Sequence, residues 1–598
     1  MSERPGQDEL EAPLNEATAA LWRHHFRAYQ TPAPFPEDDD RTLVFHITDG
    51  SARIGPAEVM SYDPGASQRM AERSPTAPPR ESEIRRPDRS GRTFAHTRGL
   101  LLIAILTVQA VLSLRLVWSN TASLNEAVDL FGGHVELAHW LHGTALPPFA
   151  TSFPGAPVIY PPLGALAASI GGLAAARLLS LAFMLGATGL LWGTTSKLFG
   201  GPAAFFAAAL FAVVGPTQAL GALATYDAMA LFLLAASAWC VVSAEDRDNS
   251  TRLLVAGMLL LALANATKYA TAVLDPAVVA LAAITVMRRR GLKPGFVRSG
   301  QIAACTLSLV CALLALGGHW YLTGVLSTTV SRAVGSTPAS VVLLDAAKWC
   351  GLVCAIAGLG VICALRPHDR SQLLIVTILT VSATLVPLDQ ARIHTTTSLF
   401  KQVDFGVWFA AAAAGFALAQ LFGVGRRMWL RAGATSLAGM LAVVLAGTAG
   451  LTQAGHFFQE WPNSTQETMV LRSLTRTHPG NYLAEDYAVP AFYLENSIPW
   501  QRWSQTGTFT FTPADGHQLL TGNAAYQAAI DDGYFSLIVL SFADTTGADQ
   551  EIVADMRRAG TYQLIADVPT QDGSGSGQVT VWAHETPRAA REGNHGHG

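Results

Sequence analysis

Residues 99–118 read GLLLIAILTVQAVLSLRLVW, and Arg115 is the only charged residue among them. An α-helix of about 20 predominantly apolar residues spans the hydrocarbon core of a bilayer. Apolar residues make up 50% of the 598-residue chain and charged residues only 14%, whereas a soluble domain carries about 25% charged residues. The stretch and the composition together predict a polytopic α-helical membrane protein.

The segment before this stretch has the opposite character. Residues 1–98 are polar and contain no apolar run that would form a signal peptide. Such a composition is typical of disorder, so we expect a largely disordered N-terminal tail. The net charge of −4 offers no electrostatic attraction to nucleic acid as a partner. All six cysteines lie in apolar blocks, so no disulfide framework is expected in the polar C-terminal part.

Ten further apolar blocks follow the first one. Several are short or contain glycine, which helices packed against neighbours tolerate. Together they define a transmembrane module over residues 99–452 with about eleven transmembrane helices. The expected spans lie near residues 99–118, 174–195, 202–215, 226–243, 252–267, 271–287, 301–322, 341–364, 372–388, 404–424 and 432–452.

Basic residues are distributed unevenly between the loops. The loop of residues 119–160 contains no Lys or Arg, while arginine clusters precede the first span and occupy later loops at 288–298, 366–370 and 426–431. Cytoplasmic loops carry the excess of Lys and Arg, so we expect a cytoplasmic N-terminus and an external 119–160 loop. An odd number of spans then places the C-terminal part outside as well.

The C-terminal part, residues 453–598, loses the long apolar blocks. Short runs of alternating apolar residues predict strands there, and residues 548–558 predict a helix between two of them. We therefore expect a small extracytoplasmic α/β domain with a flexible C-terminal tail. The predicted strands cover residues 481–485, 535–540, 562–568 and 579–584.

The 119–160 loop contains the densest group of polar side chains. Residues 126–141 have helical spacing, which predicts a helix along the membrane surface. The prolines of residues 153–163 predict an extended path back to the bilayer. An acidic loop without basic residues can activate a hydroxyl group or hold a cation; alternatively, it is the solvated face of an interfacial helix. The polar residues are Asn125, Glu126, Asp129, His134, Glu136, His139 and His142.

Two charged residues interrupt apolar segments further along. Asp227 lies at the outer end of an expected span, in ATYDAM (224–229), and Lys268 lies in NATKY (265–269). A charge at the edge of the hydrocarbon is costly unless it is paired or hydrated. Both residues are therefore functional candidates, and a lipid phosphate is one possible partner for Lys268. The alternative is that each is a structural partner of another buried group.

Further cations gather between the expected ninth and tenth spans. Arg392, His394 and Lys401 lie there among several hydroxyl side chains, and Arg332 lies in another outer segment. Arginine and lysine held in place by neighbouring structure bind phosphate well. The alternative is that these side chains reach toward lipid headgroups.

Taken in order along the chain, these motifs resemble those of the GT-C glycosyltransferases. The nearest group includes the protein O-mannosyltransferases and the aminoarabinose transferase that modifies lipid A. An odd helix count with a C-terminal outer domain also matches. Within this class, residues 398–405 and 482–486 resemble a set of actinobacterial proteins, and the resemblance covers roughly residues 95–585. The matching pieces are Asn125-Glu126, residues 155–163, Arg177, residues 225–227 and residues 267–269.

The resemblance implies a cell-membrane enzyme that moves a hexose or pentose from a polyprenyl-phosphate donor to a hydroxyl group outside the cytoplasm. The acceptor would be a glycan, lipid or protein of the cell envelope. A first-loop acid, Glu126 or Asp129, would be the general base. Asp227 would hold the acceptor or a divalent cation (Mg or Mn), for which Glu126, Asp227 and His139 are the candidate ligands. Substrate-binding roles fall to Asn125, Tyr160, Lys268, Arg332, Arg392, His394 and Lys401.

The chain departs from the family pattern at two places. The relatives usually begin the first-loop motif with Asp-Glu, where this chain has Asn125-Glu126, and they tend to have Asp-Lys-His where it has residues 400–402, Phe-Lys-Gln. An amide cannot accept a proton as a carboxylate can. Either Glu126 or Asp129 therefore serves as the base, or the chain has changed its activity and only binds a lipid-linked sugar or a partner enzyme. A transporter is a third alternative, although no pair of similar halves with broken helices is found.

Overall fold

The structure is a computed structural model that describes residues 89–585, apart from short gaps at 148–152, 247–249, 333, 366–368, 422–428, 507–508, 514–515, 517, 544–545 and 574. The described residues fall into two units, a compact one that begins at Arg98 and another that ends at Thr97. The elements below belong to the first unit, except for the beginning of the first helix. The disordered tail expected over residues 1–98 lies outside the described residues up to residue 88.

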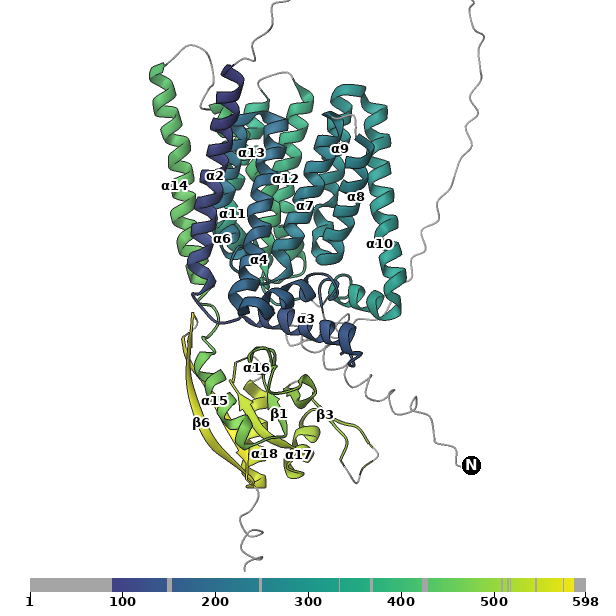
Figure 1. The fold of residues 1–598 in the computed structure, drawn as a ribbon, viewed down its shortest axis with the longest axis vertical. Helices are drawn as coiled ribbons and strands as arrows, with labels where there is room; N and C mark the ends of the chain where they lie inside the picture. Colours follow the sequence, from purple (N-terminus) through teal and green to yellow (C-terminus); the bar gives the residue numbers. More distant parts are fainter. Residues whose placement is uncertain are drawn as a thin grey trace, which may run out of the picture. The chain divides into compact units, whose positions relative to one another are not determined.

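Long apolar helices run side by side and form the larger part of the described chain (Figure 1). Ten of the described helices are long and apolar enough to cross a membrane, and α5 (Gly201–Val213) is a shorter apolar helix at the position of the third expected span. Each expected apolar block thus forms a helix, while the number that cross the bilayer stays a prediction. The long helices are α2 (Arg89–Val117), α4 (Tyr160–Phe199), α7 (Tyr226–Ser243), α8 (Ser250–Thr267), α9 (Asp275–Arg290), α10 (Leu292–Thr328), α11 (Ala339–Ala364), α12 (Arg370–Arg392), α13 (Leu399–Leu421) and α14 (Trp429–Phe457).

Helix α4 begins earlier than the sequence predicts. The extended path expected over residues 153–163 is wrong in its last part, because α4 starts at Tyr160 with two prolines in its first turn. Proline is tolerated there, since the first backbone N–H groups of a helix have no partner within the helix. The helix breaks at Gly171 and Gly172. Gly172 has a positive φ of 64°, which glycine adopts without strain. The second expected span corresponds to the part of α4 after this break.

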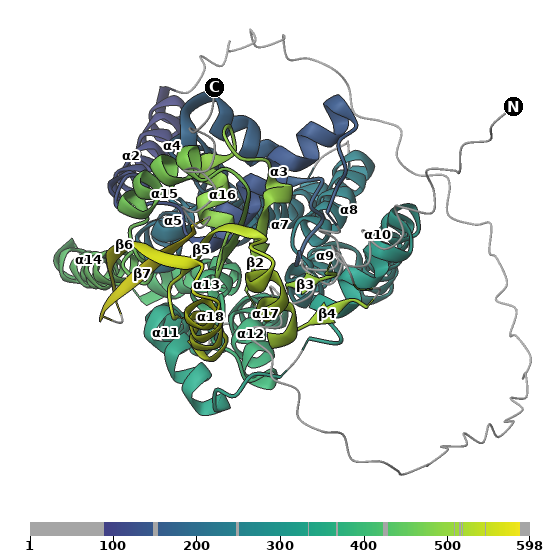
Figure 2. The same ribbon diagram turned by 90° about the horizontal axis from the view of Figure 1, so that it is seen from below.

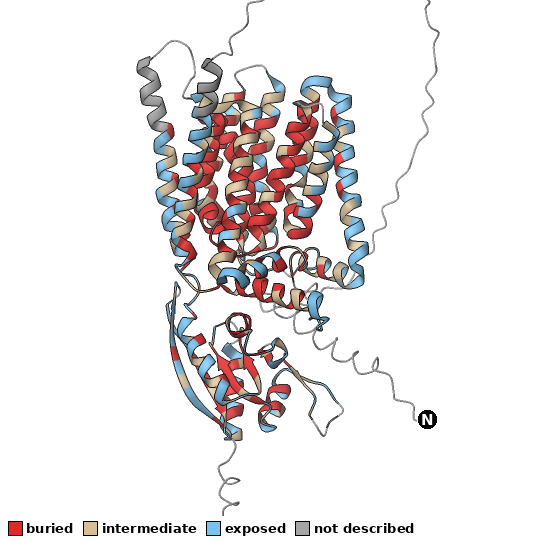
Figure 3. Cartoon of the chain, in the orientation of Figure 1, coloured by how far each residue is buried: buried red, intermediate tan, exposed pale blue. Residues whose placement is uncertain are grey.

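Helix α13 lies at the centre of the bundle. It packs against α5, α11 and α12 and is buried along nearly its whole length, whereas α10 is largely exposed (Figure 3). Small residues allow the close approach to α5, because a Cβ atom on Gly415 would lie 2.3 Å from the carbonyl oxygen of Ala203. The polar residues at the start of α13 are therefore held in a fixed, water-poor position.

The C-terminal part forms the α/β domain predicted from the sequence. Its five-stranded sheet has the order β2-β1-β5-β7-β6, in which β1 pairs in parallel with β2 and β5 while β7 pairs antiparallel with β5 and β6. All four predicted strands are confirmed, and β6 and β7 are longer than expected. The elements are α15 (Thr465–Thr477), β1 (Asn481–Ala484), α16 (Ala488–Leu494), β2 (Trp503–Gln505), β3 (Thr510–Phe511), β4 (Leu520–Thr521), α17 (Asn523–Asp531), β5 (Phe535–Leu540), α18 (Thr546–Ala559), β6 (Tyr562–Asp572) and β7 (Gly575–His584).

Helix α3 (Leu124–His142) connects the bundle with this domain. It crosses the ends of the long helices and lies beside α4, and α16 packs against it (Figures 1 and 2). The Ala122 N–H donates to the hydroxyl of Tyr493 over 2.8 Å, and His134 Nδ1 lies 2.6 Å from Glu495 Oε2. The α/β domain is thereby fixed against the helix that carries the first-loop acids.

Candidate active site

Helix α3 confirms the helix predicted from the first-loop spacing. The solvated face that one alternative expected holds for Asn125, His139 and His142, which are exposed, but not for the acidic side chains. Ser123 and Glu126 form a capping box, in which each side chain accepts from the backbone N–H of the other residue. Glu126, Asp129 and Glu136 are all buried. They are buried because α3 is packed between α4 and the α/β domain.

Glu126 is held by a bidentate ion pair with Arg177 of α4. Both N–O distances are 2.8 Å, and both side chains are fully buried. Glu126 Oε1 also accepts from the N–H of Ala224 over 2.8 Å. A bidentate pair between arginine and a carboxylate fixes the geometry of both side chains. These contacts tie α3 to α4 and to the residues before α7, and they favour a structural role for Glu126; its assignment as general base or metal ligand stays a prediction.

Asp129 lies one helical turn after Asn125 and faces the start of α7. Its side chain is 2% exposed, and its Oδ2 accepts from the N–H of Tyr226 over 3.2 Å. Burial raises the pKa of Asp129 well above its usual range, against the opposing effect of the Lys401 ammonium group. Residues four apart share a helix face, and Asn125 on this face is exposed. This face of α3 thus carries an exposed amide at position 125 and a buried carboxyl group one helical turn later.

Asp227 lies between two lysines that come from distant parts of the chain. Lys268 donates a hydrogen bond to Asp227 Oδ1, and Lys401 Nζ lies 3.5 Å from Asp227 Oδ2. The Thr225 hydroxyl donates to Oδ2 over 2.8 Å. All three charged side chains are buried. Since Asp129 interacts electrostatically with Asp227 and with both lysines, the four residues form one cluster.

The walls of this cluster include residues that sequence reasoning did not single out. Lys268 Nζ lies 5.3 Å from the ring centroid of Tyr226 and 5.4 Å from that of Phe405, which are cation–π distances. Each ring is adjacent in sequence to a charged residue, Asp227 or Asp404, and this position was the available signal. Tyr160 is buried, and its electrostatic interaction with Asp129 places it near the cluster.

The remaining candidate cations divide into two groups. Arg332 is half-buried and interacts electrostatically with Tyr226 and Lys268, so it lies close to the cluster. Arg392 is 69% exposed and forms an ion pair with Asp389 in the same helix at 2.9 Å. His394 has a positive φ of 51°, and its Nδ1 lies 3.0 Å from the carbonyl oxygen of Thr337. Lys401 and Arg332 thus lie at the cluster, whereas Arg392 contacts Asp389 and His394 contacts Thr337.

The three proposed metal ligands do not form one site. His139 is 13 residues after Glu126 on α3, which corresponds to about 20 Å along the helix axis. Glu126 is held by Arg177, and Asp227 by two lysines. Among the described residues, no group of three or more His, Cys, Asp or Glu side chains is placed to hold a metal ion.

Comparisons with known proteins agree with this fold. Residues 157–316 match the family model of dolichyl-phosphate-mannose-protein mannosyltransferases, and no curated protein matches the chain. ArnT from Cupriavidus metallidurans, solved bound to undecaprenyl phosphate, is 14% identical with a TM-score of 0.51, over 82% of this chain and 98% of ArnT. The oligosaccharyltransferase AglB from Archaeoglobus fulgidus, solved with an inhibitory peptide and a dolichol-phosphate, is 11% identical with a TM-score of 0.50, over 83% of this chain and 75% of AglB.

The chain has the fold of the GT-C class of membrane glycosyltransferases. This confirms the fold class that the motifs indicated. The match with ArnT extends over nearly all of that protein, so the correspondence includes the bundle and the C-terminal domain. The type within the class, actinobacterial or other, stays a prediction.

Proposed function

We propose that the chain transfers a sugar from a polyprenyl-phosphate donor to an acceptor hydroxyl, with the Asp129–Asp227–Lys268–Lys401 cluster as its active site. The observation that carries this proposal is the buried carboxyl group of Asp129 beside two buried lysines. A general base with a raised pKa and cations for a leaving phosphate are the two groups that such a transfer needs.

The charge of the cluster supports a phosphate as the leaving group. Lys268, Lys401 and the nearby Arg332 carry three positive charges, against at most two negative charges on Asp129 and Asp227. Structures with this fold contain undecaprenyl phosphate or dolichol-phosphate, which is consistent with a lipid-linked donor. Fixed cations at a water-poor site stabilise negative charge on a departing phosphate without reorganising.

The transfer follows from these positions. Asp129 accepts the proton of the acceptor hydroxyl while the oxygen of that hydroxyl bonds to the anomeric carbon of the sugar. The bond between that carbon and the phosphate oxygen breaks, and its electron pair stays on the phosphate beside Lys401 and Lys268. Asp227 holds the two ammonium groups in place. The acceptor is a hydroxyl-bearing glycan, lipid or protein of the cell envelope.

A donor-binding experiment tests this assignment with a matched control. Lys401→Gln should weaken binding of a polyprenyl-phosphate sugar about ten- to a hundredfold, since a charge-assisted contact contributes about 1.5–3 kcal/mol. Arg392→Gln removes the same charge from an exposed position nine residues earlier and should leave donor affinity unchanged. Purified protein and a radiolabelled donor give both affinities.

The same preparation tests turnover. Wild type should transfer label to an acceptor in membrane extract and release free polyprenyl phosphate. If the donor binds and no label is transferred with any extract, the chain is a protein that binds a lipid-linked sugar without transferring it. That is the alternative raised by the amide at position 125. If Lys401→Gln and Arg392→Gln bind the donor equally well, the phosphate does not lie in the cluster.

The arginine pattern supports a cytoplasmic N-terminus, and with it an extracytoplasmic position for the proposed site and the C-terminal domain. Ser576→Cys, on an exposed strand of the C-terminal domain, should react with a membrane-impermeant maleimide in intact cells. Lys293→Cys, at the opposite ends of the helices, should react only after lysis. Wild type reports the background from the six native cysteines. The reverse pattern would invert the topology.

A further inference from the structure

Two glutamines face each other where α12 ends and α13 begins. Gln390 lies in the last turn of α12 and Gln402 in the first turn of α13, and the two helices pack side by side. The Gln390 amide nitrogen donates to the Gln402 amide oxygen over 2.7 Å. Both residues are buried, with exposed fractions of 2% and 7%. The pair therefore joins two helix ends at a water-poor position.

This hydrogen bond leaves one group of each amide without a protein partner. A side-chain amide has one oxygen that accepts and an NH₂ group that donates. The Gln390 oxygen is fully buried and accepts no hydrogen bond from the part of the chain that the structure describes. The Gln402 nitrogen donates to none of the described residues. Turning both amides over exchanges these roles, and one donor and one acceptor still remain for a ligand.

The pair lies next to the candidate active site. Lys401 and Gln402 are four and three residues before Phe405 on α13, and residues three and four apart are neighbours on a helix surface. The Phe405 ring lies 5.4 Å from Lys268 Nζ, and Lys401 Nζ lies 3.5 Å from Asp227 Oδ2. Gln402 is therefore one helical turn from a wall of the cluster and adjacent to one of its lysines.

The chain between the two helices has an unusual backbone conformation. His394 has a φ of 51° and Ser398 a φ of 61°, a region that few residues other than glycine adopt. The Ser398 carbonyl oxygen accepts from the Gln402 N–H over 3.0 Å, and the Gln390 carbonyl oxygen accepts from the Thr395 N–H over 3.2 Å. Costly conformations persist where the surrounding structure imposes them, and they gather at binding sites. This connection fixes the two amides opposite each other.

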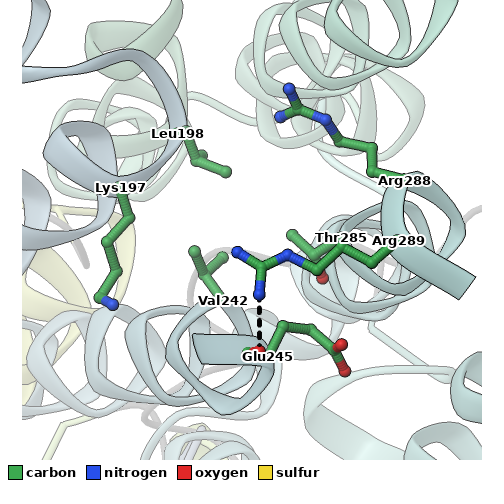
Figure 4. A pocket seen from close by; sticks show the side chains of 7 residues that line it. All are labelled: Lys197, Leu198, Val242, Glu245, Thr285, Arg288 and Arg289. Atoms are coloured by element: carbon green, nitrogen blue, oxygen red, sulfur yellow. Dashed lines mark hydrogen bonds between the residues drawn. The ribbon is translucent and has the colours of Figure 1, made fainter. Parts of the chain in front are cut away.

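Polar side chains at the other ends of the long helices meet partners within the chain. The Arg289 guanidinium group donates to the carbonyl oxygen of Glu245 over 2.8 Å (Figure 4). The Glu245 carboxylate lies 3.5 Å from Arg290 Nε and 3.8 Å from Arg298 Nη2. The glutamine pair differs from these groups, because it keeps a donor and an acceptor that no described residue meets.

We propose that the Gln390–Gln402 pair binds hydroxyl groups of the donor sugar. The inference rests on the proposed function, in which the donor phosphate lies beside Lys401. The sugar is bonded directly to that phosphate, and consecutive Cα atoms such as those of Lys401 and Gln402 are about 3.8 Å apart. A hydroxyl both donates and accepts, as the pair requires, whereas a phosphodiester only accepts. The amides thus suit the sugar, and the lysine suits the phosphate.

A simpler role for the pair is to hold the ends of α12 and α13 together, with a buried water molecule at the remaining groups. That role predicts that replacing either glutamine changes stability, or changes the affinity for every ligand alike. Sugar binding predicts a loss of affinity that depends on whether the lipid phosphate carries a sugar.

The experiment uses the full-length protein in phosphatidylcholine nanodiscs without an acceptor. Native mass spectrometry measures binding of undecaprenyl phosphate alone and of undecaprenyl phosphate that carries mannose, glucose or arabinose. Gln390→Met and Gln402→Met keep the length of the side chain and remove its hydrogen bonds. Each should weaken binding of at least one sugar-bearing lipid about five- to fiftyfold and leave binding of undecaprenyl phosphate within about twofold of wild type.

Two further variants separate this inference from the proposed function. Gln109→Met is the matched control, since Gln109 is a buried glutamine in the interior of α2 whose oxygen accepts from the Thr188 hydroxyl over 2.7 Å. It should bind every lipid as wild type does. Lys401→Gln should weaken binding of every lipid, because each one carries the phosphate.

Selective loss of the sugar-bearing lipids in the glutamine variants supports the inference, whatever Lys401→Gln does. Equal losses for lipids with and without a sugar, or no loss at all, would overturn it, while Lys401→Gln still decides the phosphate assignment. Unchanged donor affinities with a raised KM for the acceptor would assign the hydroxyl to the acceptor and would also overturn it. If one glutamine variant does not fold, the other decides from the opposite helix.

Discussion

Replacing Arg177 with methionine is expected to lower the free energy of unfolding by about 3–5 kcal/mol, because it leaves the Glu126 carboxylate buried without its partner. Methionine keeps much of the apolar volume, so the change removes mainly the charge and the donors. Besides Glu126, the guanidinium group donates to the carbonyl oxygens of Val117, Asn120 and Thr121 over 2.8–3.0 Å. These bonds join α4 to the turn between α2 and α3, so their loss loosens the support of the candidate active site.

Thermal unfolding of the purified protein measures this effect. Arg392→Met, at an exposed position, is the matched control and should unfold near the wild-type temperature. The double variant E126Q/R177M should be less destabilised than R177M, since no charge remains buried alone. Equal unfolding temperatures for R177M and R392M would show that the ion pair does not hold α3 in place.

The membrane helices could be predicted from the sequence because each one depends on a local property. A run of about 20 apolar residues has no soluble alternative of comparable stability, and the structure forms a helix at every predicted block. Strand β5 also agrees with its prediction residue for residue, because a short apolar run after turn residues is again a local signal. The start of α4 was predicted wrongly because two adjacent prolines indicate an extended chain as readily as a first helical turn.

The roles of the two first-loop acids could not be predicted in this way. Glu126 and Asp129 are three residues apart on one helix, and nothing in their neighbours tells them apart. The difference arises from Arg177, which lies 51 residues later and contacts only Glu126 of the two. Arg392 and Lys401 pose the same problem. Helix α12 ends at the exposed Arg392, whereas α13 places Lys401 in its first, buried turn.

Asp129→Asn is expected to lower the rate of sugar transfer about a hundred- to ten-thousandfold while leaving donor affinity within about twofold of wild type. This is the usual contribution of a positioned general base, and asparagine keeps the shape and the hydrogen bond from the Tyr226 N–H. The neutral side chain removes the proton acceptor and leaves both lysines of the cluster in place. The effect should therefore appear in kcat and not in the binding of the donor.

The pH dependence of turnover gives a second, independent measure. Because burial raises the pKa of Asp129, the carboxyl group is protonated and inactive over a wider acidic range than an ordinary aspartate. The wild-type kcat/KM should therefore fall as the pH drops through this raised pKa, and the residual activity of D129N should lack that acid limb.

Glu136→Gln removes another buried carboxyl group, seven residues further along α3, and is the matched control. It should keep both the wild-type rate and the acid limb of the pH profile. If D129N retains the rate of E136Q, or keeps the acid limb, the base is another group. In that case the amide at position 125 would not be compensated by Asp129. If D129N alone loses both, the base of this chain lies one helical turn after Asn125, on the buried part of the same helix face.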